Sequence, residues 1–288
     1  MIVIGADVGG TSSRVALFRG DTERARAEGR GGPMRAGGGE ALAERLADLA
    51  RPLLLREDGP RADAFVVGAS GAGRSAEREE LRAAIERHRL AWKVIVVGDA
   101  ELARAAAFSG GAGVLVIAGT GSIAISRDDA GTMRRIGGLG WRMGDQGSGY
   151  WLAARALEAV GLMHDSVGPP TRLAERLPAA AQVAGVAALV RWSTTASAAD
   201  VAALAPAVIA CADEGDPVAA ELRSAAVDAL AALATAAGGS SMSVALSGGL
   251  LAPGRPLRER LAEALERQGV TVVRKAVDPC RGAIVLAG

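Results

Sequence analysis

The stretch from Ile2 to Phe18, IVIGADVGGTSSRVALF, sets the pattern that decides the fold. An apolar run ends in a polar, glycine-rich turn and a second apolar run follows at once, which predicts a β-hairpin. In the middle of the chain, residues 114–126, VLVIAGTGSIAIS, repeat the order of apolar run, glycine turn and apolar run. A repeat of this kind indicates that the chain is internally duplicated.

The two glycine turns are suited to binding an anion. Glycine lets the backbone adopt left-handed dihedrals and approach a ligand closely, and a run of backbone N–H groups forms a concave anion site without any positive side chain. We therefore expect the two turns to hold the phosphates of one nucleotide between them. The turn residues are Gly9, Gly10 and Thr11 in the first copy and Gly119, Thr120 and Gly121 in the second.

Composition narrows the kind of partner. The chain has 288 residues, enough for two domains that each bury a core. With 33 basic and 32 acidic residues it offers no electrostatic case for binding nucleic acid or an anionic membrane, so we expect a small-molecule partner. Cys211 and Cys280 lie far apart without a CxxC spacing, which suggests neither a disulfide framework nor a zinc site and fits a reducing cytoplasm.

Two uncharged stretches, residues 105–126 and 229–254, are long enough to span a membrane. Glycine pairs and serines interrupt both, which is typical of short strands and turns rather than of spanning helices. The first residues, MIVIGADVGG, lack the basic start and the long apolar core of a signal peptide. We therefore expect a soluble, cytoplasmic protein with no membrane segment.

The remaining pattern alternates strands with helices, which implies a mixed, largely parallel sheet in each half. Apolar spacing predicts helices at residues 40–56 and 75–91 in the first half, and at residues 172–192, 198–213 and 217–237 in the second. A strand, VIVV, leads directly to Asp99, and two late strands are expected at SVAL and VTVV. The boundary between the halves is expected in the glycine-rich stretch from Ser109 to Gly113.

Six short motifs appear in order along almost the whole chain: DVGGT from Asp7, GDA around Asp99, GTGS from Gly119, the glycine-rich segment 137–151, ADEGDP from Ala212 and SGG from Ser247. In this combination the sequence resembles the BadF/BadG/BcrA/BcrD ATPase family of the actin-like superfamily, and within it the N-acetylglucosamine kinase branch. The resemblance implies an α/β fold of two actin-like (ribonuclease H-like) domains, each a mixed five-stranded sheet with helices, flanking a nucleotide cleft. It implies domains at residues 1–110 and 111–288, a last helix able to pack back on the N-terminal domain, a hinge near Gly110, and a homodimer.

The activity implied by the resemblance is transfer of the γ-phosphate of ATP to a hydroxyl of an amino sugar, N-acetylglucosamine or glucosamine, at carbon 6. Asp99 matches the family's catalytic aspartate, and it lies at the C-terminal end of a buried strand, where open α/β sheets bind ligands, so it can take the proton of the acceptor hydroxyl. The alternative is a cap on the following helix. Asp7, at the end of the first strand, is expected to face Mg²⁺ through its water shell, with an Asx-turn cap as the alternative.

The resemblance places sugar contacts at Gly138 and Asp145. It places the adenine of ATP beside Gly248, Gly249 and Ala212, where small residues let the base approach the backbone.

The chain departs from the family pattern around the acceptor. Relatives carry GGWG and GDEG where this chain has Leu139 and Gln146, and the chain contains no asparagine. The sugar kinases usually place an asparagine after a glycine-proline turn, which corresponds here to residues 31–37, GGPMRAG. The identity of the acceptor therefore stays open, and Arg35 or Arg142 could contact an acidic one.

Other nucleotide sites fit less well. GTGSIA matches the dinucleotide pattern G-x-G-x-x-A, but a strand-like alternation follows the glycines instead of a helix. A P-loop is excluded because neither Lys93 nor Lys275 follows a GxxxxG. Two other functions stay open: an ATPase of the BadF/BadG type that activates a partner enzyme, whose iron–sulfur cluster would need suitably placed cysteines, and a non-enzymatic nucleotide-binding or assembly module.

Overall fold

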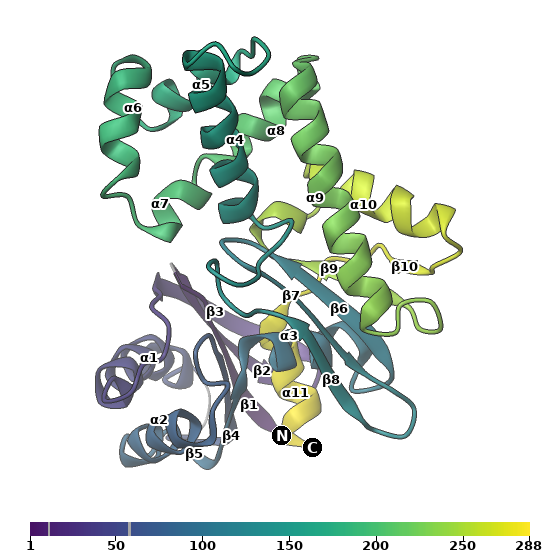
Figure 1. Cartoon of the computed structure of the whole chain (residues 1–288). Coiled ribbons are helices and arrows are strands. Elements are labelled where there is room, and N and C mark those ends of the chain that lie inside the picture. The colour runs from purple at the N-terminus through teal and green to yellow at the C-terminus, as the bar shows by residue number, and fades with distance from the viewer. Residues whose placement is uncertain (11, 57–58) are drawn as a thin grey trace. The chain divides into compact units, whose positions relative to one another are not determined.

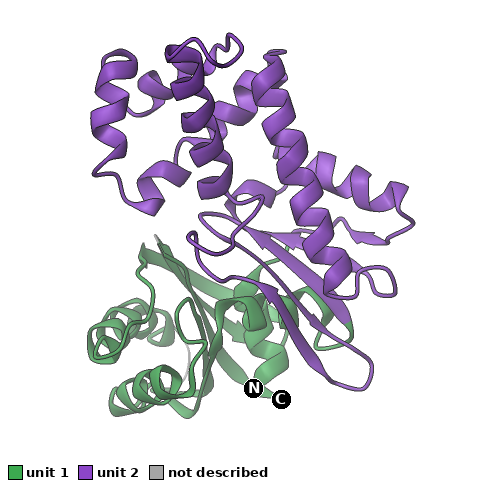
Figure 2. Ribbon diagram, in the orientation of Figure 1, with its two compact units in different colours: residues 1–112, 277–288 green, residues 113–276 purple. Residues whose placement is uncertain are grey.

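The computed structural model describes residues 1–10, 12–56 and 59–288. The chain forms two compact units: unit 1 comprises residues 1–112 and 277–288, and unit 2 comprises residues 113–276 (Figure 2). The last residues of the chain therefore belong to the same unit as the first.

Unit 1 is built on a mixed five-stranded sheet of order β3-β2-β1-β4-β5 (Figure 1). The strands are β1 (Ile2–Val8), β2 (Ser12–Arg19), β3 (Thr22–Arg30), β4 (Ala62–Ala69) and β5 (Ala91–Gly98). β1 pairs antiparallel with β2, as the opening stretch predicts, and parallel with β4 on its other side. β5 extends the parallel part beyond β4. The carboxyl ends of β1, β4 and β5 therefore meet at one edge of the sheet.

Helices cover both faces of this sheet. α1 (Gly39–Leu54) and α2 (Ser75–Arg87) share a buried core with Ile4, Ala6 and Val8 of β1. On the opposite face, α3 (Asp99–Phe108) and α11 (Gly282–Ala287) pack against Val3, and the short 3-10 helix η2 (Pro279–Arg281) leads into α11. Side chains alternate between the faces of a strand. The nearly continuous apolar run of β1 is therefore buried on both sides.

Unit 2 repeats this topology in a sheet of order β10-β9-β6-β7-β8. The strands are β6 (Gly113–Ala118), β7 (Ser122–Arg127), β8 (Met133–Gly137), β9 (Val244–Ser247) and β10 (Val272–Val273). β6 pairs antiparallel with β7 and parallel with β9, as β1 does with β2 and β4. The predicted α/β fold with two mixed five-stranded sheets is therefore confirmed, and the duplication is visible in the strand order.

The helices of unit 2 pack on its sheet and on one another. They are α4 (Gly149–His164), α5 (Leu173–Ala180), α6 (Gly185–Ser193), α7 (Ala198–Ala202), α8 (Ala205–Asp213), α9 (Pro217–Ala236), the 3-10 helix η1 (Gly249–Leu251) and α10 (Pro256–Arg267). The continuous helices predicted at residues 172–192 and 198–213 are wrong. Left-handed φ values of 57° at Gln182 and 72° at Gly185 separate α5 from α6. Pro206 in the first turn of α8 starts a new helix, since it has no N–H to continue the previous one.

No single helix among the described residues has both the length and the hydropathy of a membrane span. The pair α5 and α6, which lie at 57° to each other, meets those criteria only when its two helices are counted together.

Gly5 is a position at which β1 tolerates no side chain. A Cβ there would lie 2.4 Å from the carbonyl oxygen of Cys280 and 2.8 Å from the Cβ of Ala283, so the C-terminal segment packs directly on β1. We expect Gly5→Ala to lower the free energy of unfolding by about 1–3 kcal/mol, the usual cost of overpacking a core, in urea denaturation.

Gly161→Ala is the matched control for this prediction. Nothing lies within 4 Å of a Cβ built at this position of α4, so the same change should stabilise the protein by about 0.5–1 kcal/mol. Equal effects of the two substitutions would contradict the direct packing of the C-terminal segment on β1.

Candidate functional site

The sheet of unit 1 brings Asp7 and Asp99 to the same edge. Asp7 pairs with Gly68 of β4, and Gly98, directly before Asp99, pairs with Ala69. One strand therefore separates the two backbones, a distance of about 10 Å at the usual strand spacing. The side chains approach closely enough for Asp99 to be the strongest charge that acts on Asp7.

The carboxyl group of Asp7 lies where a negative charge is unfavourable. Burial, followed by the charge of Asp99, raises the pKa of Asp7 to about 6, against the opposing effect of Arg14. A carboxyl group perturbed by burial and by one specific charged neighbour is typical of a functional site.

Asp99 is oriented by the helix that it begins. The N-cap residue of α3 is Gly98, which has no side chain to accept a hydrogen bond from the first turn of the helix. Oδ1 of Asp99 accepts a hydrogen bond from the N–H of Ala100 at 2.9 Å. The carboxylate thus lies at the positive end of α3 as well as at the edge of the sheet.

A third carboxylate near Asp7 was missed in the sequence. Asp278, in the C-terminal segment, forms an ion pair with Arg26 of β3, which also binds Glu23. Asp278 and Arg26 both act on the charge of Asp7, in opposite directions. The two partners lie 252 positions apart in the sequence, so no local motif could have indicated the pair.

The surroundings of Asp7 fit a hydrated magnesium ion better than a metal enclosed by protein ligands. Within the described part of the chain, no group of three or more His, Cys, Asp or Glu side chains is placed to hold a metal ion. Magnesium keeps several waters and is commonly bound through one or two carboxylates and the phosphates of a substrate. The poorly balanced charge of Asp7 is the observation that fits a cation at this place.

The first glycine turn follows β1 and is open on one side. Gly9 N–H donates to the carbonyl of Ser12 at 3.0 Å, and nothing lies within 4 Å of a Cβ built on Gly10. On its other side the turn is supported by Gly32, whose N–H donates to the carbonyl of Gly9 at 3.0 Å. Thr11, predicted to act with these glycines, lies outside the described residues.

The second glycine turn is joined to the start of α4. The carbonyl of Gly119 accepts from Gly149 N–H at 2.8 Å, and the carbonyl of Thr120 accepts from Tyr150 N–H at 3.2 Å. Thr120 itself is exposed. The first N–H groups of α4 are therefore bonded to this turn, and the positive end of the α4 dipole lies beside it.

Asp145 is buried against the second turn in a left-handed backbone conformation, with a φ of 61°. Its Oδ1 accepts from Ser122 N–H at 3.2 Å, and a Cβ on Gly121 would lie 2.8 Å from its Oδ2. Burial raises the pKa of Asp145, while the bond from Ser122 opposes the shift. Gly138, the other predicted sugar contact, donates its N–H to the carbonyl of Ser122 at 2.9 Å. A strained, buried carboxylate of this kind points to a functional position.

The turn after β9 lies beside the second glycine turn. A Cβ on Gly248 would lie 2.4 Å from the carbonyl oxygen of Ala118, and one on Gly119 would lie 3.9 Å from the nitrogen of Gly249. The structure thus places Gly248 and Gly249, two of the residues predicted for the adenine, beside Gly119 of the turn predicted for the phosphates.

Arg258 of α10 supports this turn and was also missed in the sequence. Its buried guanidinium donates to the carbonyls of Leu246 and Leu251 at 2.8 Å each, so it joins the end of β9 to η1. No motif distinguishes it from the other arginines of α10.

Ala212 lies in α8 and is buried. It is 5 % exposed and belongs to the core of unit 2. The rest of its motif has a structural role: Asp216 caps α9 by accepting from Ala219 N–H at 2.9 Å, and it also accepts from the Thr171 hydroxyl. The contact of Ala212 with adenine stays a prediction.

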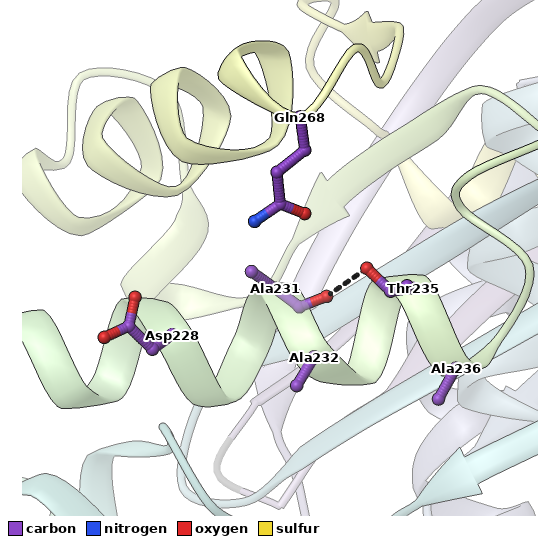
Figure 3. Close-up of a pocket in the computed structure, with 6 residues that line it drawn as sticks. All are labelled: Asp228, Ala231, Ala232, Thr235, Ala236 and Gln268. Carbon is purple, nitrogen blue, oxygen red and sulfur yellow. Dashed lines mark hydrogen bonds between the residues drawn. The ribbon is translucent and has the colours of Figure 1, made fainter.

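A recess of about 460 Å³ lies elsewhere on unit 2, between α9 and the end of α10 (Figure 3). Alanines form half of its lining, and the hydroxyl of Thr235 is already bonded to the carbonyl of Ala231 at 3.0 Å. The remaining polar side chains are Asp228 and Gln268. None of the predicted site residues lines the recess, and we assign no ligand to it.

The comparison with family models gives one match over almost the whole chain. The model of the BadF/BadG/BcrA/BcrD ATPase family covers residues 4–287. The chain therefore belongs to this family, as its motifs predicted.

Individual relatives are similar over different lengths. An N-acetylmuramic acid/N-acetylglucosamine kinase of Clostridium acetobutylicum is 37% identical over 110 residues, which cover 38% of this chain and 36% of that protein. An N-acetyl-D-glucosamine kinase of Dictyostelium discoideum is 37% identical over 28% of this chain and 25% of that protein. Both matches thus span well under half of the relatives' lengths.

The fold agrees over the full chain with a crystal structure from Chromobacterium violaceum, described as that of a candidate N-acetylglucosamine kinase. The TM-score is 0.82 and the identity 26%, over 100% of this chain and 99% of that one.

We expect the charge of Asp7 to lower stability wherever it is ionised. Its pKa of about 6 in the folded protein lies above the ordinary value of 3.8. Between these values the folded protein keeps a proton that the unfolded chain has released, so stability falls as the pH rises to about 6 and is level above it. Asp7→Asn should therefore be more stable than wild type at pH 8 and equally stable near pH 4, as measured by urea denaturation.

Asp129→Asn, in the exposed turn between β7 and β8, is the control because it removes a carboxylate that is not buried. A wild-type protein more stable than Asp7→Asn at pH 8 would show that the charge of Asp7 is balanced after all.

Proposed function

We propose that this member of the BadF/BadG/BcrA/BcrD family is an ATP-dependent kinase that transfers the γ-phosphate to an amino sugar, N-acetylglucosamine or glucosamine, at the 6-hydroxyl. The observation that carries the proposal is the placement of Asp7 and Asp99 at one sheet edge, with the charge of Asp7 poorly balanced. Phosphoryl transfer uses one carboxylate to orient the acceptor and others to hold the cation of the nucleotide. The named kinases among the relatives support the choice of sugar.

In this proposal the glycine turns hold ATP. Gly9, Gly10 and Thr11 bind the phosphates through backbone N–H groups and a hydroxyl, and Gly119, Thr120 and Gly121 bind them in the same way. The adenine lies beside Gly248 and Gly249, with Ala212 as its further contact. Asp7 holds Mg²⁺ through water, and the ion supplies neutralisation of charge on the phosphoryl oxygens when it is bound.

Asp99 acts as the general base. Its carboxylate orients the acceptor hydroxyl and accepts its proton as the phosphoryl group is transferred. Asp145 binds hydroxyls of the sugar, and Gly138 lets the sugar approach the backbone. Closure about Gly110, which has a φ of 82°, would exclude water so that phosphate passes to the sugar. The proposal includes a homodimer in the cytoplasm.

Asp99→Asn tests the base. We expect kcat for ADP release with Mg·ATP and sugar to fall by about 10²–10⁴, the usual contribution of a general base, while the KM for ATP changes little. The acceptors to compare are N-acetylglucosamine, glucosamine, glucose and no sugar.

Two outcomes would contradict the proposal. ADP release that is indifferent to every sugar would favour an ATPase, and full activity of Asp99→Asn would remove its assignment as base.

The ATPase that activates a partner enzyme is disfavoured by the cysteines: both are buried, and burial raises the pKa of the Cys280 thiol to about 12. A colourless, iron-free purified protein would disfavour it further.

Thr120→Val tests the second turn. Loss of one hydroxyl bonded to a charged phosphate should raise the KM for ATP about tenfold or more. The KM for the sugar should stay the same, as should both constants in Thr195→Val, whose hydroxyl bonds a helix carbonyl at 3.3 Å. Equal losses for ATP and sugar in Thr120→Val would rule out a role specific to the nucleotide.

A further inference from the structure

Ser122, the first residue of β7, bonds the loop between β8 and α4, residues 138–148, at three places. Its N–H donates to Oδ1 of Asp145 at 3.2 Å, and its carbonyl accepts from the N–H of Gly138 at 2.9 Å. Its hydroxyl donates to the carbonyl of Gln146 at 2.7 Å. Ser122 is 3 % exposed. One buried residue therefore holds both ends of the loop that carries the two predicted sugar contacts.

The loop is fixed at its ends and exposed between them. At the C-terminal end, a Cβ on Gly147 would lie 2.7 Å from the carbonyl oxygen of Ala226, so the backbone there packs directly on α9. Between the ends, Leu139 and Met143 are 66 % and 78 % exposed. The bonds from Ser122 are therefore the hydrogen bonds that join the two ends of this exposed loop to β7.

Ser122 also follows directly after the second glycine turn. The turn is closed by a bond from the N–H of Gly119 to the carbonyl of Gly121 at 2.9 Å. A Cβ on Gly121 would lie 2.8 Å from Oδ2 of Asp145, so the turn and this carboxylate are in direct contact. Because packed protein interiors transmit small displacements, a shift of the turn also displaces Asp145.

We propose that Ser122 is a positioning residue that couples the two ligands, so that nucleotide binding at the turn orders loop 138–148 and strengthens sugar binding; this inference rests on the proposed kinase function. The ligand that binds first bears the cost of ordering the turn and the loop together, and the second ligand then binds more tightly. Thermodynamic linkage requires the sugar to strengthen nucleotide binding by the same factor.

The conformation of Asp145 explains why the loop depends on Ser122. The left-handed φ of 61° is costly for a residue with a side chain, and it persists only where its surroundings hold it. The N–H and carbonyl of Ser122 are backbone groups that every residue has. Its hydroxyl, bonded one residue after Asp145, is the part of the junction that a substitution removes.

The coupling has a consequence for phosphoryl transfer. A kinase that binds each ligand more tightly in the presence of the other is populated mainly as the complex with both. The sugar loop is then ordered around an acceptor when the γ-phosphate is in place, which favours transfer to the sugar over transfer to water.

Calorimetry with a non-hydrolysable ATP analogue and Mg²⁺ tests the coupling without turnover. In wild type the analogue should lower the Kd of N-acetylglucosamine or glucosamine by about fivefold or more, and the sugar should lower the Kd of the analogue equally. Ser122→Ala should reduce this factor by about threefold or more, the net effect of one hydrogen bond. Ser122→Thr, which keeps the hydroxyl, should retain part of the coupling. Ser126→Ala is the control, because it removes a buried hydroxyl of the same strand and should keep the wild-type factor.

Hydrogen exchange of the wild-type protein gives a second test that does not depend on the folding of a variant. The analogue alone, with Mg²⁺, should slow exchange of the Gly138 and Ser122 amides, both of which bond across this junction. Unchanged exchange at both amides would overturn the inference.

The binding data separate this inference from the kinase proposal. Binding of both ligands to wild type without mutual strengthening, or with the same factor in Ser122→Ala, would overturn the coupling and leave the kinase function standing. Failure of the analogue or of both sugars to bind wild type would overturn the kinase proposal and this inference with it.

Discussion

The parallel pairing of β1 with β4, and of β4 with β5, is the constraint on which the site in unit 1 depends. It aligns the carboxyl ends of three strands, so that the residues following them meet at one edge whatever their distance in the sequence. Unit 2 uses the same arrangement, in which β6 pairs parallel with β9 and the turns after both strands lie side by side. The rest of each site is supported from this edge by loops with close backbone contacts.

The buried negative charge at this edge lowers the stability of the folded protein. The burial of Asp7 beside Asp99 is unfavourable while both are ionised, and the charges of Arg14 and Arg26 compensate only in part. In the proposed function, a hydrated Mg²⁺ bound with the nucleotide would balance this charge. The strained conformation of Asp145 in unit 2 is comparable: packing against Gly121 and one backbone bond hold a left-handed aspartate in place.

The fold could be predicted where its pattern is local. The hairpins β1–β2 and β6–β7, the strand before Asp99, and helices α1 and α9 follow from apolar spacing and glycine turns. β3 and β8 were missed because they are largely exposed edge strands, whose sequences TERARAEGR and MRRIG carry little apolar alternation beyond Ala25 and Ala27. The breaks after α5 and α7 were missed because an alanine-rich sequence keeps helical spacing across a short irregular turn.

The sequence by itself determined the family, the duplicated hairpin and the order of the site motifs, because glycine turns and strand-end aspartates are local features of the chain. Only the tertiary structure decided which of these residues meet. Asp278 forms an ion pair with Arg26, which lies 252 positions away in the sequence. The guanidinium of Arg258 in α10 donates to the carbonyl of Leu246 at the end of β9. The N–H of Met34 donates to the carbonyl of Ser70, which holds the segment after β3 against the loop after β4. Such contacts depend on strand order and on the packing of backbone against glycine, which a periodic pattern along one segment does not specify.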